Sequence, residues 1–118
     1  MIGLDRLMKI KGVVAAGQFS EHGKVIRGAG EISDEIMNET ARMCAYQNQK
    51  LGELTKYFEK ISEMEWQPLI GWAVWGGKYV VMVMGNTGVF IEAKHADFRE
   101  LMVDLLETEP TGARQMNY

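Results

Sequence analysis

The stretch GWAVWGGKYVVMVMGNTGVFIE, residues 71–92, decides the fold that the sequence predicts. It holds only two charged residues, Lys78 and Glu92, in a chain whose charged residues make up 25% of the whole. A strand with one face in water alternates apolar and polar residues, but the run from Val80 to Met84 is apolar at every position. We therefore expect this strand to be covered on both faces.

Two glycine-containing turns divide this region into strands. Residues 76–77 are GG and residues 85–88 are GNTG, which are typical of turns. Pro68 lies just before the first strand, where proline is tolerated. The pattern predicts three strands, over residues 69–75, 78–84 and 89–93.

The N-terminal part predicts a short helix followed by a hairpin. Apolar residues fall near helical spacing in the first ten positions, and Gly12 is where such a helix would end. The segments GVVAAGQFS (12–20) and KVIRGAGE (24–31) are typical of strands, and the turn between them contains Gly23.

A long helix is predicted from Ser33 onward. Serine is a good N-cap, and Asp34 and Glu35 suit the positive end of the helix dipole. Side chains that recur at three- and four-residue steps form one stripe along it, opposite a solvated face: Ile36, Thr40, Met43, Cys44, Gln47, Leu51, Leu54, Phe58 and Ile61.

Asp97 is positioned to cap a last helix with an apolar face, so the predicted order is helix, two strands, long helix, three strands, helix. We expect an α/β (α+β) domain with a five-stranded antiparallel sheet. The long helix would cover one face and the two terminal helices the other, which explains a strand buried on both sides. Residues 1–106 would form this single domain and residues 107–118 a flexible C-terminal tail.

Composition indicates which partners and which cellular compartment the protein is expected to have. A net charge of −3 and a pI near 5.4 argue against sequence-independent binding of nucleic acid. Cys44 is the only cysteine, which excludes an intramolecular disulfide and fits a reducing compartment. The sequence has no signal-peptide pattern at its N-terminus and no uncharged apolar run of about 20 residues. We expect a cytoplasmic protein that does not insert into a membrane.

The element order and several segments resemble the roadblock family, whose dynein light-chain type fold is profilin-like. The segments are LDRLMKIKGVVAAGQF, GKVI, the helix that begins at Ser33, and residues 71–92. The sequence is similar, more closely, to a bacterial roadblock-like family of uncharacterised function. The resemblance implies the sheet order 2-1-5-4-3, with strand 69–75 at an edge. It also implies a homodimer and a protein partner, with a small Ras-like GTPase as the favoured class.

The resemblance places a dimer interface on the edge strand and the adjoining long helix. Strand alternation puts Trp72 and Val74 on one face and Ala73 and Trp75 on the other, so a second subunit would bury at least one tryptophan. The expected interface residues are Met43, Cys44, Gln47, Leu51, Leu54, Leu69, Trp72, Val74 and Trp75.

The sequence offers little for catalysis or cofactor binding. His22 and His95 are the only histidines, and neither has a partner at an obvious metal spacing. We expect no metal and no cofactor. Cys44 lies on the helical stripe, where a buried thiol that packs as a small hydrophobe and a redox-sensitive thiol that links two subunits are both open.

These observations predict a non-catalytic homodimeric scaffold or regulator. The alternative is a small-molecule sensor, in which a ligand would lie between the sheet and the long helix. A sizeable internal pocket with a few polar groups would favour the sensor, and a closed apolar core would favour the scaffold.

Overall fold

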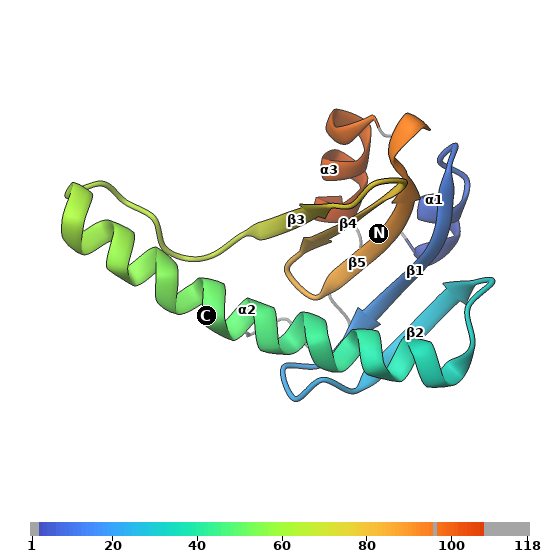
Figure 1. Cartoon of the computed structure of the whole chain (residues 1–118), viewed down its shortest axis with the longest axis horizontal. Coiled ribbons are helices and arrows are strands. Elements are labelled where there is room, and N and C mark those ends of the chain that lie inside the picture. The colour runs from blue at the N-terminus through green and yellow to red at the C-terminus, as the bar shows by residue number, and fades with distance from the viewer. Residues whose placement is uncertain (1–2, 96, 108–118) are drawn as a thin grey trace.

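The computed structural model describes residues 3–95 and 97–107, and its element order is the predicted one with a short 3₁₀ turn added (Figure 1). The elements are α1 (Leu4–Met8), β1 (Val13–Phe19), β2 (Val25–Gly30), α2 (Asp34–Ser62), β3 (Gly71–Trp75), β4 (Tyr79–Met84), β5 (Thr87–Glu92), the 3₁₀ turn (Ala93–His95) and α3 (Phe98–Glu107). The tail expected over residues 107–118 lies outside the described residues except for Glu107, which ends α3. The domain boundary at 106 therefore stays a prediction.

The five strands form one antiparallel sheet in the order β2-β1-β5-β4-β3, so the predicted fold and sheet order are confirmed. Two strand boundaries differ from the prediction. β3 begins at Gly71 rather than at residue 69, and β5 already begins at Thr87. The turn between β4 and β5 holds only Gly85 and Asn86, because Gly85 takes a φ of 62° that suits a two-residue hairpin turn.

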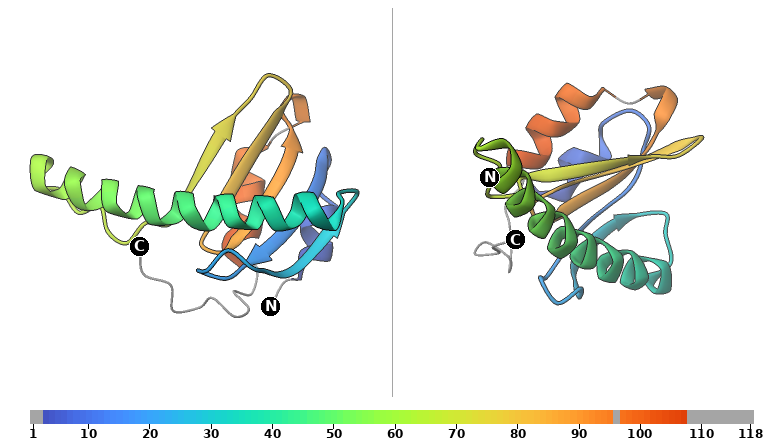
Figure 2. Two further views of the ribbon diagram at one scale, coloured as in Figure 1. Left: turned by 60° about the horizontal axis from the view of Figure 1, so that its bottom comes forward. Right: turned by 60° about the vertical axis from the view of Figure 1, so that its left-hand side comes forward.

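Helices cover both faces of the sheet (Figure 2). α1 and α3 lie on one face, where their leucines pack with β4 and β5 residues such as Val80 and Ile91. α2 crosses the other face, where Val83 of β4 packs with Cys44. β4 is thus buried on both sides, as its unbroken apolar run predicted.

The stripe predicted on α2 is not its buried face. Ser33 caps the helix as expected, since its Oγ accepts a hydrogen bond from the backbone N–H of Ile36. The buried residues, however, are Ala41, Cys44, Ala45, Asn48, Gly52 and Thr55. Most of the predicted stripe lies about 110° away around the helix axis. The physical reason is size, because small side chains let the helix backbone approach the sheet more closely than large ones do.

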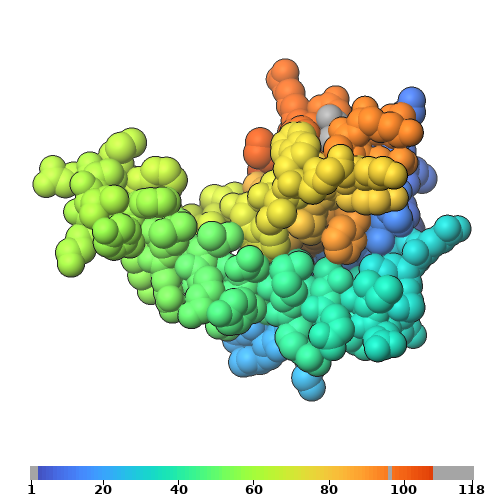
Figure 3. Space-filling model, in the orientation of Figure 1, coloured from blue at the N-terminus to red at the C-terminus, as the bar shows by residue number. Residues whose placement is uncertain are grey.

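α2 is much longer than the sheet face that it covers. Its C-terminal half projects beyond the sheet, and the chain returns from there to β3 along an extended segment (Figures 1 and 3). The contacts of α2 with the sheet are concentrated on β1 and β2. The projecting half therefore has little of this chain to pack against.

Candidate functional site

Exposed apolar side chains are concentrated on α2, the loop after it and β3. Of sixteen large hydrophobic residues that are exposed in the described part of the chain, six lie on α2, three in the loop and two in β3. We call these eleven residues the α2–β3 surface: Ile36, Met43, Tyr46, Leu54, Tyr57, Ile61, Met64, Trp66, Ile70, Val74 and Trp75. Exposed apolar side chains concentrated on neighbouring elements make this region the candidate interaction site of the described residues.

The loop that joins α2 to β3 is held against the end of the helix. The carboxylate of Glu59 accepts hydrogen bonds from the backbone N–H groups of Trp66 (3.0 Å) and Gln67 (2.8 Å). The indole N–H of Trp66 donates to Ser62 Oγ, and its ring packs on Phe58 with 5.0 Å between centroids. These contacts fix the position of apolar side chains at the projecting end.

β3 is an edge strand, as the prediction required. It pairs with β4 on one side, and no described strand pairs with its other side. The N–H of Gly85 bonds to the carbonyl of Ile70, and the N–H of Gly76 to that of Tyr79. Since antiparallel bonding alternates along a strand, the backbone groups of Gly71, Ala73 and Trp75 point outward from the sheet.

The two tryptophans of β3 lie on opposite faces, as strand alternation predicted. Trp72 is half-buried on the α2 side, where its indole N–H donates to Asn48 Oδ1 at 2.6 Å. Trp75 is 62% exposed and packs on Phe98 of α3, with 4.3 Å between ring centroids. Trp75 is therefore the more accessible of the two for a second chain.

The remaining predicted interface residues separate by accessibility. Met43, Leu54 and Val74 are exposed, and Gln47, Leu51 and Leu69 are half-buried. Cys44 is buried between α2 and the sheet, so this chain itself already covers it. Burial raises the pKa of its thiol to about 12, which supports the packing role over the redox role.

Asn48 is the polar residue that the sequence reasoning missed. It is buried, and its Nδ2 donates to the carbonyl of Gly85 at 2.9 Å while its Oδ1 accepts from Trp72. One side chain thus ties α2 to β3 and to the β4–β5 turn. An asparagine in the interior of a long predicted helix was the available signal, because such residues usually prefer caps and turns.

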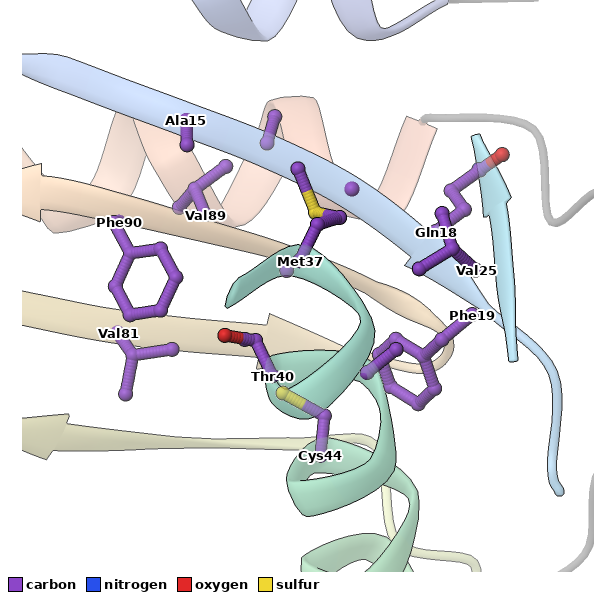
Figure 4. A pocket seen from close by; sticks show the side chains of 14 residues that line it. Ala15, Gln18, Phe19, Val25, Met37, Thr40, Cys44, Val81, Val89 and Phe90 are labelled. Atoms are coloured by element: carbon purple, nitrogen blue, oxygen red, sulfur yellow. The ribbon is translucent and has the colours of Figure 1, made fainter. Parts of the chain in front are cut away.

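A small cavity lies between α2 and the sheet (Figure 4). Its volume is about 30 Å³, which admits a water molecule but is far below the roughly 300 Å³ or more of a typical ligand pocket. Apolar side chains from both layers dominate its lining, which includes Phe19, Val25, Met37, Val81 and Phe90.

Among the residues that the structure describes, the titratable side chains do not form a recognisable catalytic set. His22 is exposed in the β1–β2 turn with Glu21 at 3.6 Å, and His95 lies at the far end of β5. Within residues 3–95 and 97–107, no three His, Cys, Asp or Glu side chains are placed to hold a metal ion. No helix in that part of the chain is long and apolar enough to span a membrane.

Solved structures with a similar fold include a Roadblock/LC7 domain and MglB. A Roadblock/LC7 domain from Streptomyces avermitilis is similar with a TM-score of 0.71 and 15% identity, over 89% of this chain and 90% of that one. Myxococcus xanthus MglB is similar with a TM-score of 0.65 and 13% identity, over 86% and 81%. A second structure of MglB, with a tetrameric arrangement, is similar with a TM-score of 0.69 and 12% identity, over 86% of this chain and 75% of that one.

The chain is thus a roadblock-type domain by fold, as the resemblance implied. It belongs to the family of uncharacterised conserved proteins named DUF2173, whose family model matches residues 3–107. No curated protein matches the sequence at a significant level.

Proposed function

We propose that this protein is a non-catalytic homodimeric scaffold or regulator. The observation that carries the proposal is the α2–β3 surface next to an open sheet edge. Such an edge is a template for pairing with another strand, and a two-fold dimer would bring the same patch of each chain together.

The outward backbone groups of β3 suggest how two copies would pair. An antiparallel arrangement centred on Ala73 would oppose Ala73 to its copy and Gly71 to Trp75 of the second chain. Each of these pairs would exchange two hydrogen bonds. Ala73 is small, so the strands would approach at the two-fold axis without displacing a large side chain.

The exposed side of α2 supports the same arrangement. Met43, Leu54 and Ile61 are 40%, 41% and 59% exposed, although they are apolar residues in a helix of 29 residues. A second copy that pairs through β3 would place its own α2 on the same side of the extended sheet. Burial of these residues would then contribute to association, at roughly 25 cal/mol per Å² of apolar surface.

The first experiment is a solution mass at micromolar protein concentration. Light scattering is expected to give about twice the chain mass of 13.3 kDa. A monomer mass at that concentration would remove the basis for the proposal.

The proposed partner of the dimer is a protein, and a small Ras-like GTPase is the class to test first. The relation to roadblock domains supports this choice at the level of fold. Purified GTPases from the source cell would be titrated in both nucleotide states against the wild type and against a dimer-weakened variant. If neither the wild type nor the variant binds a GTPase in either nucleotide state, small GTPases are excluded as the partner class.

A small-molecule-binding regulator is the second candidate. The position of the cavity under α2 supports it, whereas the small volume of that cavity favours the scaffold. Its position is the one expected of a ligand between sheet and helix, although about 30 Å³ is small. A ligand that raises the melting temperature and also shifts the dimer or partner equilibrium would support this function.

A further inference from the structure

We propose that the cavity under α2 binds a slim, uncharged aliphatic molecule with one hydrogen-bonding end, and that Met37 is the movable side chain that fills this space when no ligand is bound. This inference rests on the second candidate function, and it does not depend on the dimer. It names the ligand class and the residue that controls entry.

Gly17 and Gly88 line the cavity, and with Gly28 they form a row of three glycines on adjacent strands. Gly17 of β1 pairs with Gly28 of β2 on one side and with Gly88 of β5 on the other. None of the three has the positive φ that favours glycine, whereas Gly12, Gly23, Gly30 and Gly85 do. Backbone geometry therefore does not require glycine in this row, and glycine within a strand weakens it. What the row provides is space over the sheet.

Met37 takes up much of that space. A Cβ at position 28 would lie 2.7 Å from Met37 Cε, and one at position 17 would lie 3.1 Å from its Sδ. Figure 4 shows this side chain reaching from α2 over β1. Methionine is unbranched and adaptable, and Met37 is only half-buried. It can swing outward to leave a trough over the glycines, which a branched residue from the sheet could not do.

One wall of the cavity carries two groups able to form hydrogen bonds. Cys44 is 3% exposed and lines the cavity, and no hydrogen bond to its thiol is formed by the described residues. Thr40 lies one turn before it on α2 and projects toward Val81 and Phe90 (Figure 4). A buried thiol aimed into an apolar space, with a hydroxyl beside it, offers a ligand one polar contact point.

The lining sets the chemical class of the ligand. None of the lining residues is charged, and the lining side chains other than Gln18, Met37, Thr40 and Cys44 are aliphatic or aromatic. An ionised group would lose its hydration there without a partner, which is strongly unfavourable. The ligand is therefore neutral and slender, with an aliphatic chain over the glycines and a hydroxyl or carbonyl at Thr40 and Cys44.

The test uses the full-length protein and 1-hexanol as the probe, with hexanoate as the charged counterpart. Amide NMR shifts would be followed up to about 10 mM of each compound, a range suited to weak ligands of few atoms. We expect saturable shifts with hexanol for residues that line the cavity, and no such shifts with hexanoate.

Three variants make the result specific. Met37→Ala is expected to bind hexanol about tenfold more tightly, because the side chain that competes for the space is gone. Met102→Ala on α3 is the matched control and should bind as the wild type does. Thr40→Val keeps the shape and removes the hydroxyl, so binding should weaken about fivefold, as expected for one net hydrogen bond.

Each other outcome contradicts the inference at a defined point. Equal affinities of Met37→Ala and Met102→Ala for hexanol would show that Met37 is not the side chain that fills the cavity in the absence of ligand. Saturation by hexanoate at the same residues would refute the ligand class while leaving a small-molecule function in place. Hexanol shifts confined to surface residues would refute the site itself. Saturable binding at the cavity with no effect on dimer or partner would instead uphold the site and refute the regulatory function.

Discussion

The two halves of α2 belong to one unbroken helix but meet different surroundings. The N-terminal half lies on the sheet through small residues such as Ala41 and Ala45, above a row of glycines. The C-terminal half projects from the sheet, carries large apolar residues such as Tyr57 and Ile61 in the open, and is capped by its own loop. The difference shows that hydrophobicity alone does not locate the buried face of a helix. Side-chain size decides which face can approach a sheet.

The largest expected effect concerns the tightly packed half. The pKa of Cys44 is raised from 9.0 to about 12 by burial, so at pH 8 the native thiolate fraction should be about a thousandfold lower than in the unfolded chain. Alkylation at pH 8, followed by mass spectrometry with and without denaturant, would measure this ratio. Rapid labelling of the native protein would show that this half opens easily.

The same shift has a consequence for stability. The folded chain holds the thiol proton of Cys44 more firmly than the unfolded chain does. The contribution of this protonated thiol to the free energy of unfolding is therefore complete below pH 9.0. It is lost progressively as the pH rises from 9.0 toward about 12.

The next largest effect is expected at Asn48, where the two halves meet. Asn48→Ala removes hydrogen bonds to Trp72 and to Gly85 and leaves both partners unsatisfied, so the free energy of unfolding should fall by about 3 kcal/mol. Urea denaturation would measure it. Gln49→Ala, at an exposed neighbouring position, is the control and should change stability little.

Overfilling the packed half should have a smaller effect. Ala45→Leu inserts a larger side chain between α2 and the sheet, which should destabilise the fold by about 2 kcal/mol. Leu54→Ala, on the projecting half, should leave the unfolding of the dissociated chain nearly unchanged. Both variants would be unfolded in urea at a protein concentration below the dissociation constant of the dimer. Equal destabilisation would show that the two halves of α2 do not differ in packing.

The proposed interface predicts an effect of similar size on association. Trp75→Ala should weaken the dimer by about 2 kcal/mol, because the exposed indole would be buried by the second chain. Trp72→Ala should also weaken it, but this indole contributes to the fold through Asn48 as well. Sedimentation velocity would compare both with His95→Ala, which should associate normally. Wild-type affinity in both tryptophan variants would exclude the β3 edge.

The smallest expected effect is local and lies at the projecting end. Glu59→Gln keeps the shape but weakens the charge-assisted hydrogen bonds to the N–H groups of Trp66 and Gln67. Hydrogen exchange of these two amides should become faster without a change in global unfolding. If their exchange stays the same, Glu59 does not hold the loop.

Much of the fold could be predicted because local sequence patterns indicate the helices and the strands. The apolar run from Val80 to Met84 required cover on both faces, and the cap at Ser33 set the start of the long helix. The resemblance to roadblock proteins supplied the sheet order, which pattern alone does not give. Strand ends were less accurate, since a turn such as GNTG can lie partly within a strand.

The sequence by itself determined the helices and strands, their order, and that Trp72 and Trp75 lie on opposite faces of their strand, because strand and helix periodicities are local properties of the chain. Only the tertiary structure decided which side of α2 is buried. That choice depends on how closely a helix can approach a sheet, and residues far apart in sequence set this distance: Ala41 and Ala45 on one layer, Phe19 and Val83 on the other. The same long-range packing left the large apolar residues of α2 exposed and placed Met37 over the glycines.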